Sequence, residues 1–421
     1  MRSSILPVAS LLMSAFFMLA AGGLAGYLIP LRAVQEGWST FQISLIATGY
    51  AIAFTLGCII TPRLVLRVGH IRVFAVLAAL MSISLLMHAL VLNSVAWIFF
   101  RGIAGFSIAG GYMVIESWLN ERVTNETRGA VFSVYMAVSM IAVMTGQFIV
   151  PFGDPGAASL FMVCAIIYAL ALMPTGLSSA QSPQPLTQVN VDLKGLYLKS
   201  PAAAVGSLLA GIVSGTWHNL APVFAEQNGL TTTQGATMLA AAMVGGAVFQ
   251  IPLGRYSDRV DRRYMMTFAG AIGAFFCAIA IAAGTSNIYV FLAAVFLLGS
   301  VLFPIYALNV AHANDFAEPD EFVTVAGGLL IIYGVGTMVG PLIAGAAMDR
   351  FGSPSLFAVI GTAFVLYGSY AFYRTFRRPQ ADDEERTDFQ AIPIPRTQTP
   401  QTYELDPRVD VAVEEDAHER L

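Results

Sequence analysis

The sequence predicts an all-α integral membrane protein with twelve transmembrane helices in two six-helix halves. Composition is the first indication, because 57% of the 421 residues are apolar and only 11% are charged, whereas about a quarter of a soluble domain is charged. The second is a set of twelve apolar runs of about 20 residues, the length that crosses the hydrocarbon core. The third is a polar break in the middle of the chain, which leaves six runs on either side.

The first half is predicted to occupy residues 1–177. Its opening run follows Arg2 and ends in small residues, as a secretory signal peptide would, but the eleven runs that follow favour an uncleaved first helix. The six predicted spans of this half are residues 8–30, 41–61, 73–92, 95–119, 129–152 and 157–177.

The second half is predicted to begin after a linker. Residues 178–200 are polar and contain several prolines, which is typical of a loop between two structural units. The second half then occupies residues 201–375. Its six predicted spans are residues 201–226, 233–253, 264–284, 287–311, 322–346 and 354–373.

The end of the chain, residues 376–421, has a different composition. From Pro379 onward it carries twelve acidic and four basic residues, a net charge of −8 within a chain of net charge −4. Such a segment buries too little apolar surface to fold alone, so it is predicted to be a disordered, acidic cytoplasmic tail. Docking of a partner on the tail is the alternative.

The orientation follows from the lysine and arginine residues of the loops, which accumulate on the cytoplasmic side of membrane proteins. With the N-terminus inside, fifteen basic residues fall on the inner side, and only Arg32 and Arg350 fall on the outer side. Both termini and the linker are therefore predicted to be cytoplasmic, in a bacterial-type plasma (inner) membrane.

Several kinds of chemistry are not expected. The cysteines Cys58, Cys164 and Cys277 lie in or beside apolar runs without paired spacing, which indicates neither a disulfide framework nor a metal site. A nucleotide-binding loop of the Walker type is absent from the sequence, so ATP coupling is not expected. We expect no enzyme activity, no cofactor and no nucleic-acid partner; the expected partners are the lipid bilayer and a small-molecule solute, and a monomer is expected.

Two segments of the chain repeat at a fixed distance. PRLVLRVGHIRVF begins at Pro62 and GRYSDRVDRRYMM begins at Gly254, and the offset of 192 residues aligns Arg67 with Arg259. TGQFIVPFG in the fifth run and VGPLIAGAAMDRFG in the eleventh are related at nearly the same offset. Related halves are typical of transporters.

The second copy of the repeated loop is rich in charge, with Asp258, Arg259, Arg262 and Arg263. A carboxylate flanked by guanidinium groups at a helix end can form charge-assisted hydrogen bonds that break and reform as helices slide. These residues are therefore predicted to act as a gating latch. A merely positive inner loop is the alternative.

At these residues the chain resembles a known family. GRYSDRVDRR, starting at Gly254, resembles the loop signature of the major facilitator superfamily (MFS), which is best known between the second and third spans. Here the copy after the second span departs from the signature, with Pro62 in place of glycine and Leu66 in place of the acidic residue. Arg101 and the glycine after it resemble the fourth-span motif of the family.

A stretch of small residues in the eleventh run resembles the antiporter motif of the same family, which is expected in the fifth span. Because it is displaced, helix packing is the favoured role, since small residues let another helix approach closely. The stretch comprises Gly336, Gly340, Pro341 and Gly345. PRL…RVGHIR together with ESWLN is similar to the YcaD-like branch. The resemblance covers residues 1–375 and implies the MFS fold.

The fourth predicted span, RGIAGFSIAGGYMVIESWLNE, contains Arg101 and Glu116. Fifteen helical residues separate the two by about 22 Å, so they do not pair. Arg101 is predicted to line a cavity, the alternative being an anchor that snorkels to the interface. Glu116 is predicted to reach interfacial water and to gate the inner face by bonding Arg63 or Arg67, the alternative being an ordinary interfacial glutamate.

In the resembled fold, the first, fourth, seventh and tenth spans line a central cavity. The resemblance therefore implies a set of polar cavity residues in addition to Arg101, although each such residue taken singly more often serves packing or interhelical hydrogen bonding than ligand contact. The set comprises Tyr27, Tyr112, Trp217, His218, Asn219, Tyr306 and Asn309.

The predicted function is secondary active transport of a small organic solute by alternating access between two rocking halves. Proton-coupled efflux is expected by family analogy, with Glu116, Glu226 and His218 as titratable groups near the path. An organic-anion facilitator or exchanger is the alternative, because the predicted cavity holds an arginine and lacks a deep carboxylate. A non-transporting membrane sensor or scaffold is the alternative of another class.

Overall fold

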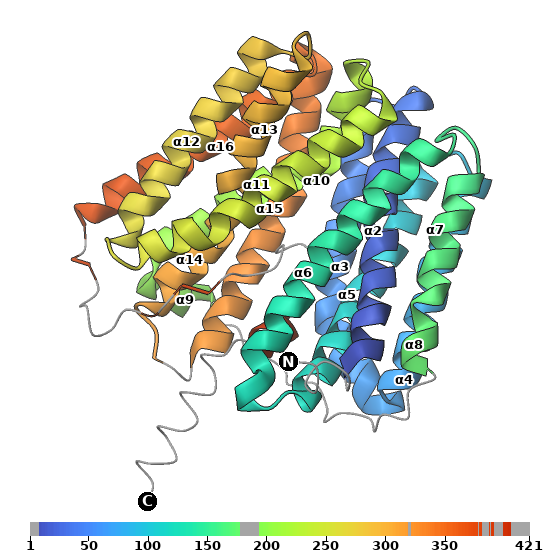
Figure 1. Cartoon of the computed structure of the whole chain (residues 1–421), viewed down its shortest axis with the longest axis horizontal. Coiled ribbons are helices and arrows are strands. Elements are labelled where there is room, and N and C mark those ends of the chain that lie inside the picture. The colour runs from blue at the N-terminus through green and yellow to red at the C-terminus, as the bar shows by residue number, and fades with distance from the viewer. Residues whose placement is uncertain are drawn as a thin grey trace, which may run out of the picture.

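The computed structural model describes residues 8–176, 193–318, 321–377, 379–380, 387, 389–390 and 399–405, and every regular element in these ranges is a helix (Figure 1). Eleven stretches of the described chain are long and apolar enough to cross a membrane. The number rises to twelve when α9 (Leu193–Lys199) and α10 (Pro201–Gln227), which meet at 114°, count as one span. The prediction of an all-helical membrane protein is confirmed. Most of the predicted linker lies outside the described residues.

The first half is a bundle of long helices. Its elements are α2 (Ala9–Gln35), α3 (Thr40–Val68), α4 (His70–Leu90), α5 (Ser94–Arg122), α6 (Asn125–Ile149), the short η2 (Val150–Phe152), α7 (Ser159–Leu170) and α8 (Leu172–Gly176). The second half follows α9, begins with α10 and has a similar order of long helices. Its remaining elements are α11 (Thr232–Ser257), α12 (Arg262–Ala283), α13 (Ile288–Leu302), α14 (Pro304–Asn314), α15 (Phe322–Phe351) and α16 (Ser355–Thr375).

Helix starts preserve the internal duplication. At the start of α3 the side chain of Ser39 accepts a hydrogen bond from the backbone N–H of Gln42, and the Gln42 side chain bonds back to Ser39. Thr231 and Gln234 form the same reciprocal cap at the start of α11, again 192 residues later. Each cap satisfies two N–H groups that the first helical turn leaves unpaired. The repeat therefore extends from the charged loops to the opposite helix ends.

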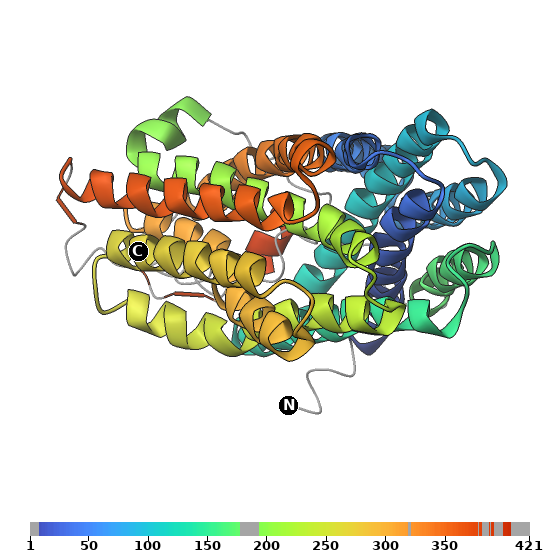
Figure 2. The same ribbon diagram turned by 90° about the horizontal axis from the view of Figure 1, so that it is seen from above.

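The two halves lie side by side, as the view from above shows (Figure 2). Within the second half, α15 crosses α10 closely, because Gly336 and Gly340 leave no room for a Cβ atom against the backbone of Leu208 and Ile212. Gly345 lies equally close to Ser44 of the first half. Pro341 is accommodated inside α15. This stretch of small residues thus lies at helix crossings within and between the halves.

Hydrogen bonds join the halves on one side of the bundle, which we call the distal side. The backbone N–H groups of Thr40 and Phe41 donate to the carboxylate of Asp349 at 2.8 and 2.9 Å. The hydroxyl of Tyr27 donates to the carbonyl of Thr232 at 2.8 Å. We call these contacts the distal seam.

The opposite side is where α2 begins and α16 ends, and we call it the termini side. Toward it the contacting helices α6 and α11 diverge (Figure 1). Part of the C-terminal tail lies here: η5 (Pro400–Leu405) contacts α5, α6 and α15. Thr399, Gln401 and Thr402 are 0%, 1% and 1% exposed. The prediction of a solvated tail is therefore wrong for these residues, because they pack between helices of both halves.

Candidate functional site

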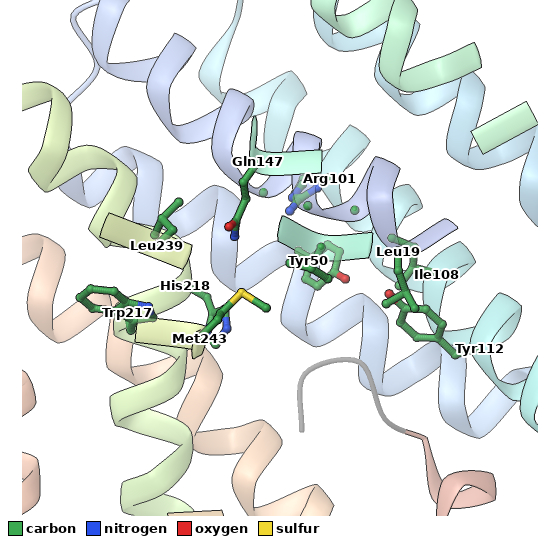
Figure 3. A pocket seen from close by; sticks show the side chains of 14 residues that line it. Leu19, Tyr50, Arg101, Ile108, Tyr112, Gln147, Trp217, His218, Leu239 and Met243 are labelled. Carbon is green, nitrogen blue, oxygen red and sulfur yellow. The ribbon is translucent and has the colours of Figure 1, made fainter. Parts of the chain in front are cut away.

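A central cavity of about 740 Å³ lies between the halves (Figure 3). Most of its lining is apolar or small, and its polar side chains include Tyr50 from α3, Arg101 and Tyr112 from α5, Gln147 from α6 and His218 from α10. The other lining residues are Leu19, Gly22, Gly23, Gly26, Ile108, Val143, Trp217, Leu239 and Met243.

Arg101 is held inside the bundle by an aromatic ring. Its side chain is 5% exposed, and Cζ of the guanidinium lies 4.4 Å from the centre of the Tyr50 ring. A guanidinium over an aromatic face gains cation–π energy while its edge remains available for hydrogen bonds. Arg101 therefore presents a positive charge to the cavity rather than to the lipid.

A second cavity of about 700 Å³ adjoins the first, since Tyr50 lines both. It lies among α3, α10 and α15, and Asn219, Thr55, Tyr333 and Thr337 supply its polar groups. Pro400 of the tail also lines it. A residue of the tail therefore borders the cavity that adjoins the central one.

Two hydroxyl groups link the cavities. Tyr333 donates from its hydroxyl to Oγ of Ser214 at 2.6 Å. Nδ1 of His218 lies 3.2 Å from the same Oγ and 2.8 Å from the backbone carbonyl of Ser214. When Nδ1–H donates to that carbonyl in the neutral ring, Nε2 of His218 is the nitrogen that carries no hydrogen. A titratable ring is therefore positioned in the cavity that holds Arg101.

The predicted cavity residues separate into two groups. Arg101, Tyr112, Trp217 and His218 line the central cavity, and Asn219 lines the second. Tyr27 belongs to the distal seam instead.

Tyr306 and Asn309 on α14 line neither of these two cavities. The Tyr306 ring lies 4.9 Å from that of Tyr333, and Oδ1 of Asn309 accepts a hydrogen bond from the Tyr367 hydroxyl at 3.0 Å. The cavity placement expected for Tyr27, Tyr306 and Asn309 is thus corrected, because their polar atoms are used at helix–helix contacts.

Sequence reasoning did not single out Tyr50, which lies on α3 and contributes to both cavities. Its aromatic ring stands in an apolar run between small residues, TGYAIA, and that contrast is the available signal. Gln147 and Tyr333 are polar side chains in apolar runs, but they lie on the fifth and eleventh spans rather than on those expected to line the cavity.

Glu116 lies on the termini side of α5 and is 0% exposed. Its carboxylate accepts hydrogen bonds from the Tyr135 hydroxyl at 3.1 Å and from the hydroxyl of Thr399. The expectation that Glu116 reaches interfacial water is therefore wrong. Arg63 and Arg67 are exposed, and their pairing with Glu116 stays a prediction.

The charged loop after α11 forms a compact ion-pair network. Arg262 pairs with Asp258 at 2.9 Å and with Asp315 at 2.8 Å, and Arg263 pairs with Asp261 at 2.6 Å. Arg262 and Arg263 are each 3% exposed, whereas Arg259 is exposed.

Two carboxyl groups of this network, Asp261 and Asp315, differ in the direction in which their pKa is shifted. Burial raises the pKa of Asp315 above its ordinary value, against the opposing effect of Arg262. Burial also acts to raise the pKa of Asp261, but hydrogen bonds from Arg263 outweigh it and hold that pKa below its ordinary value. The arginine partner therefore favours the ionised form of Asp261 enough to outweigh burial, whereas at Asp315 burial outweighs the arginine.

Comparison with known proteins identifies the family. Residues 11–217 and 203–402 match the family model of the Major Facilitator Superfamily. The uncharacterized MFS-type transporter YcaD of Escherichia fergusonii is 25% identical over 368 residues, covering 86% of this chain and 94% of the relative. Its counterpart in Escherichia coli is 24% identical over 366 residues, with the same coverage.

Solved structures share the fold. A point mutant of the nucleoside transporter NupG is similar with a TM-score of 0.74 at 13% identity, covering 87% of this chain and 99% of that one. A bacterial homologue of the human lysosomal transporter Spinster, in an inward-facing and occupied conformation, has a TM-score of 0.71 at 13% identity and covers 92% of this chain and 98% of its own. With two related halves around a shared cavity and family matches over both, the chain belongs to the Major Facilitator Superfamily and is a multi-pass membrane transporter of a small solute.

Proposed function

We propose that the protein transports a small organic anion with an apolar or aromatic body by alternating access. The observation that carries this proposal is Arg101: among the described residues that line the two cavities, it is the one with a permanent charge. The apolar lining suits the body of such a solute, and the guanidinium suits its carboxylate or another planar anionic group.

The closed distal seam supports access of the solute to the central cavity from the termini side. The distal seam closes the opposite side through the contact of Asp349 with Thr40 and Phe41. On the charge pattern of the loops, the termini side is proposed to be cytoplasmic. The described state then corresponds to an inward-facing transporter. Reporter fusions at Gln188 and after Asp388 test this orientation, and a signal from the opposite side would contradict it.

Proton coupling through His218 is a second element of the proposal. Histidine is the side chain that changes charge between about pH 5 and 8, and here it shares the central cavity with Arg101. Efflux driven by the proton gradient remains the direction expected by family analogy. An imposed pH gradient across vesicles, with parent and His218→Gln protein compared, tests the coupling. A parent protein that ignores the gradient contradicts it.

The main test is solute exchange in sealed vesicles that contain the purified protein. A panel of aromatic and aliphatic carboxylates is compared with their neutral amides, and we expect exchange of the carboxylates. Arg101→Lys keeps the charge but loses the planar fork, and Arg101→Ala loses both. We expect both variants to insert normally and to exchange at least about tenfold more slowly. Equal exchange of acids and amides, or full activity of Arg101→Ala at equal abundance, contradicts the proposal.

A further inference from the structure

The described tail residues contact both halves of the transporter on the termini side. Residues 387 and 389 lie against the second half, and residues 399–402 lie against the first half and α15. One short stretch of chain therefore connects two units that alternating access requires to move relative to one another.

On the second half, the tail binds the charged loop. The backbone N–H of Thr387 donates to Asp315 at 3.2 Å, and its carbonyl accepts a hydrogen bond from Arg262. The backbone N–H of Phe389 donates to Asp258 at 3.0 Å, and the Phe389 ring packs on Gly254, where a Cβ atom would collide with it. The ion-pair network thus also serves as a docking site for backbone groups of the tail.

On the first half, the tail binds α5. The hydroxyl of Thr399 donates to the buried carboxylate of Glu116, and the side-chain amide of Asn120 donates to the backbone carbonyl of Gln401 at 3.1 Å. A hydrogen bond to a carboxylate is about twice as strong as one between neutral groups. Thr399 is therefore the strongest single attachment point of this segment.

The docked segment fills the space that would close in the opposite state. It contacts α5 and α6 of one half and α15 of the other, and Pro400 lines the second cavity. For the termini side to close, these helices must approach one another, and a wedge of buried residues between them prevents it.

We propose that residues 399–402 are an intramolecular plug, which docks in the termini-side mouth of the transport path and arrests the protein in the described conformation. The occupant is the tail itself, because both attachment points belong to one chain and the tether gives the segment a high effective concentration. Only the expected effect on solute flux rests on the proposed function; docking and undocking are independent of the solute.

The native thiol of Cys58 reports docking, because Cys58 and Pro400 line the same cavity. We would measure the rate at which a water-soluble maleimide labels Cys58 in the purified full chain, in a chain that ends at Arg377 and in Thr399→Val. Cys164 and Cys277 are 0% and 1% exposed, and Cys58→Ser gives their background. We expect labelling of Cys58 to rise about tenfold in the truncated chain and by a smaller factor in Thr399→Val. Thr362→Val, at an exposed position of α16, is the matched control and should label at the parental rate.

A synthetic peptide of residues 387–405 should restore protection of the truncated chain, and the same peptide carrying Thr399→Val should restore much less. This rescue separates undocking from misfolding of the truncated protein. Vesicle exchange by the truncated chain should be faster than by the full chain. Equal labelling of Cys58 in the full and truncated chains overturns the plug, whatever the flux. A labelling response without exchange of any tested anion supports the plug and counts instead against the proposed solute class.

Discussion

The two copies of the termini-side turn share their position in the duplicated fold but differ in chemistry. In the first half, α3 passes to α4 through Gly69 alone, whose positive φ of 85° suits glycine, and Arg67 beside it is exposed. In the second half, the equivalent position is Asp261, which caps α12 and pairs with the buried Arg263. The two turns therefore occupy equivalent positions but differ in backbone conformation, because φ is 85° at Gly69 and −57° at Asp261. The ion pairs described above lie at the second copy.

The difference gives the halves unequal roles at the tail. The second half presents Asp258 and Asp315 to backbone N–H groups of the tail. The first half lacks an acidic residue at Leu66, and its buried carboxylate, Glu116, comes from α5 and binds Thr399. The same function, holding the tail, is carried by a loop in one half and by a helix in the other.

The largest effect is expected from Arg262→Ala, which removes the centre of the network and leaves Asp315 buried without its cationic partner. Breaking a buried ion pair costs about 3–5 kcal/mol. Thermal unfolding in detergent should show a clear loss for Arg262→Ala. The exposed Arg259 and Arg67 are the matched controls, and their alanine variants should stay within about 0.5 kcal/mol of the parent. Similar losses for all three would remove the distinction between the two copies.

A smaller, pH-dependent effect is expected from Asp261→Asn, which keeps an N-cap residue but removes the charge that pairs with Arg263. The pKa of Asp261 is held below its ordinary value, so its contribution to stability is present above the unfolded pKa of about 3.9 and is lost as the pH falls through the folded-state pKa. Unfolding at pH 7 should show a loss of about 1 kcal/mol, and the difference from the parent should close as the pH falls below the folded-state pKa of Asp261. A pH-independent difference would assign the loss to altered packing.

Glu116→Gln tests the attachment of the tail to the first half. The amide keeps an acceptor oxygen for Thr399 but loses the charge, so tail docking should weaken about threefold. Labelling of Cys58 should rise accordingly. Glu121→Gln, on the same helix but exposed, is the control and should leave labelling unchanged. If both variants behave alike, general loss of negative charge is the cause.

The smallest effect is expected from Leu66→Asp, which places a carboxylate in the first copy where the second has Asp258. Leu66 is 56% exposed, and exposed charges contribute about 0–1 kcal/mol. Unfolding and Cys58 labelling should therefore remain close to those of the parent. A large stabilisation would mean that the first copy can still assemble the network and that only the acidic residue is missing.

The sequence predicts the membrane fold and its duplication well, because apolar length and repeated motifs are local properties. It also predicts that Arg101 lines a cavity and that charged residues cluster around Asp258. It did not predict the burial of Glu116, since composition does not tell which segment covers a helix end. The docking of Thr399 was missed for a related reason: residues 399–402 have no apolar pattern, and their burial depends on a mouth formed by helices distant in sequence.

The distal seam has a consequence for the surroundings in which the transporter works. Its carboxylate, Asp349, sits on the first N–H groups of α3, where the helix dipole favours negative charge. Such contacts are screened by dissolved ions once they open to water, and the screening length shortens from about 10 Å at 0.1 M to about 3 Å at 1 M salt. We therefore expect dissolved salt to weaken the attraction that recloses the distal seam once that seam has opened to water.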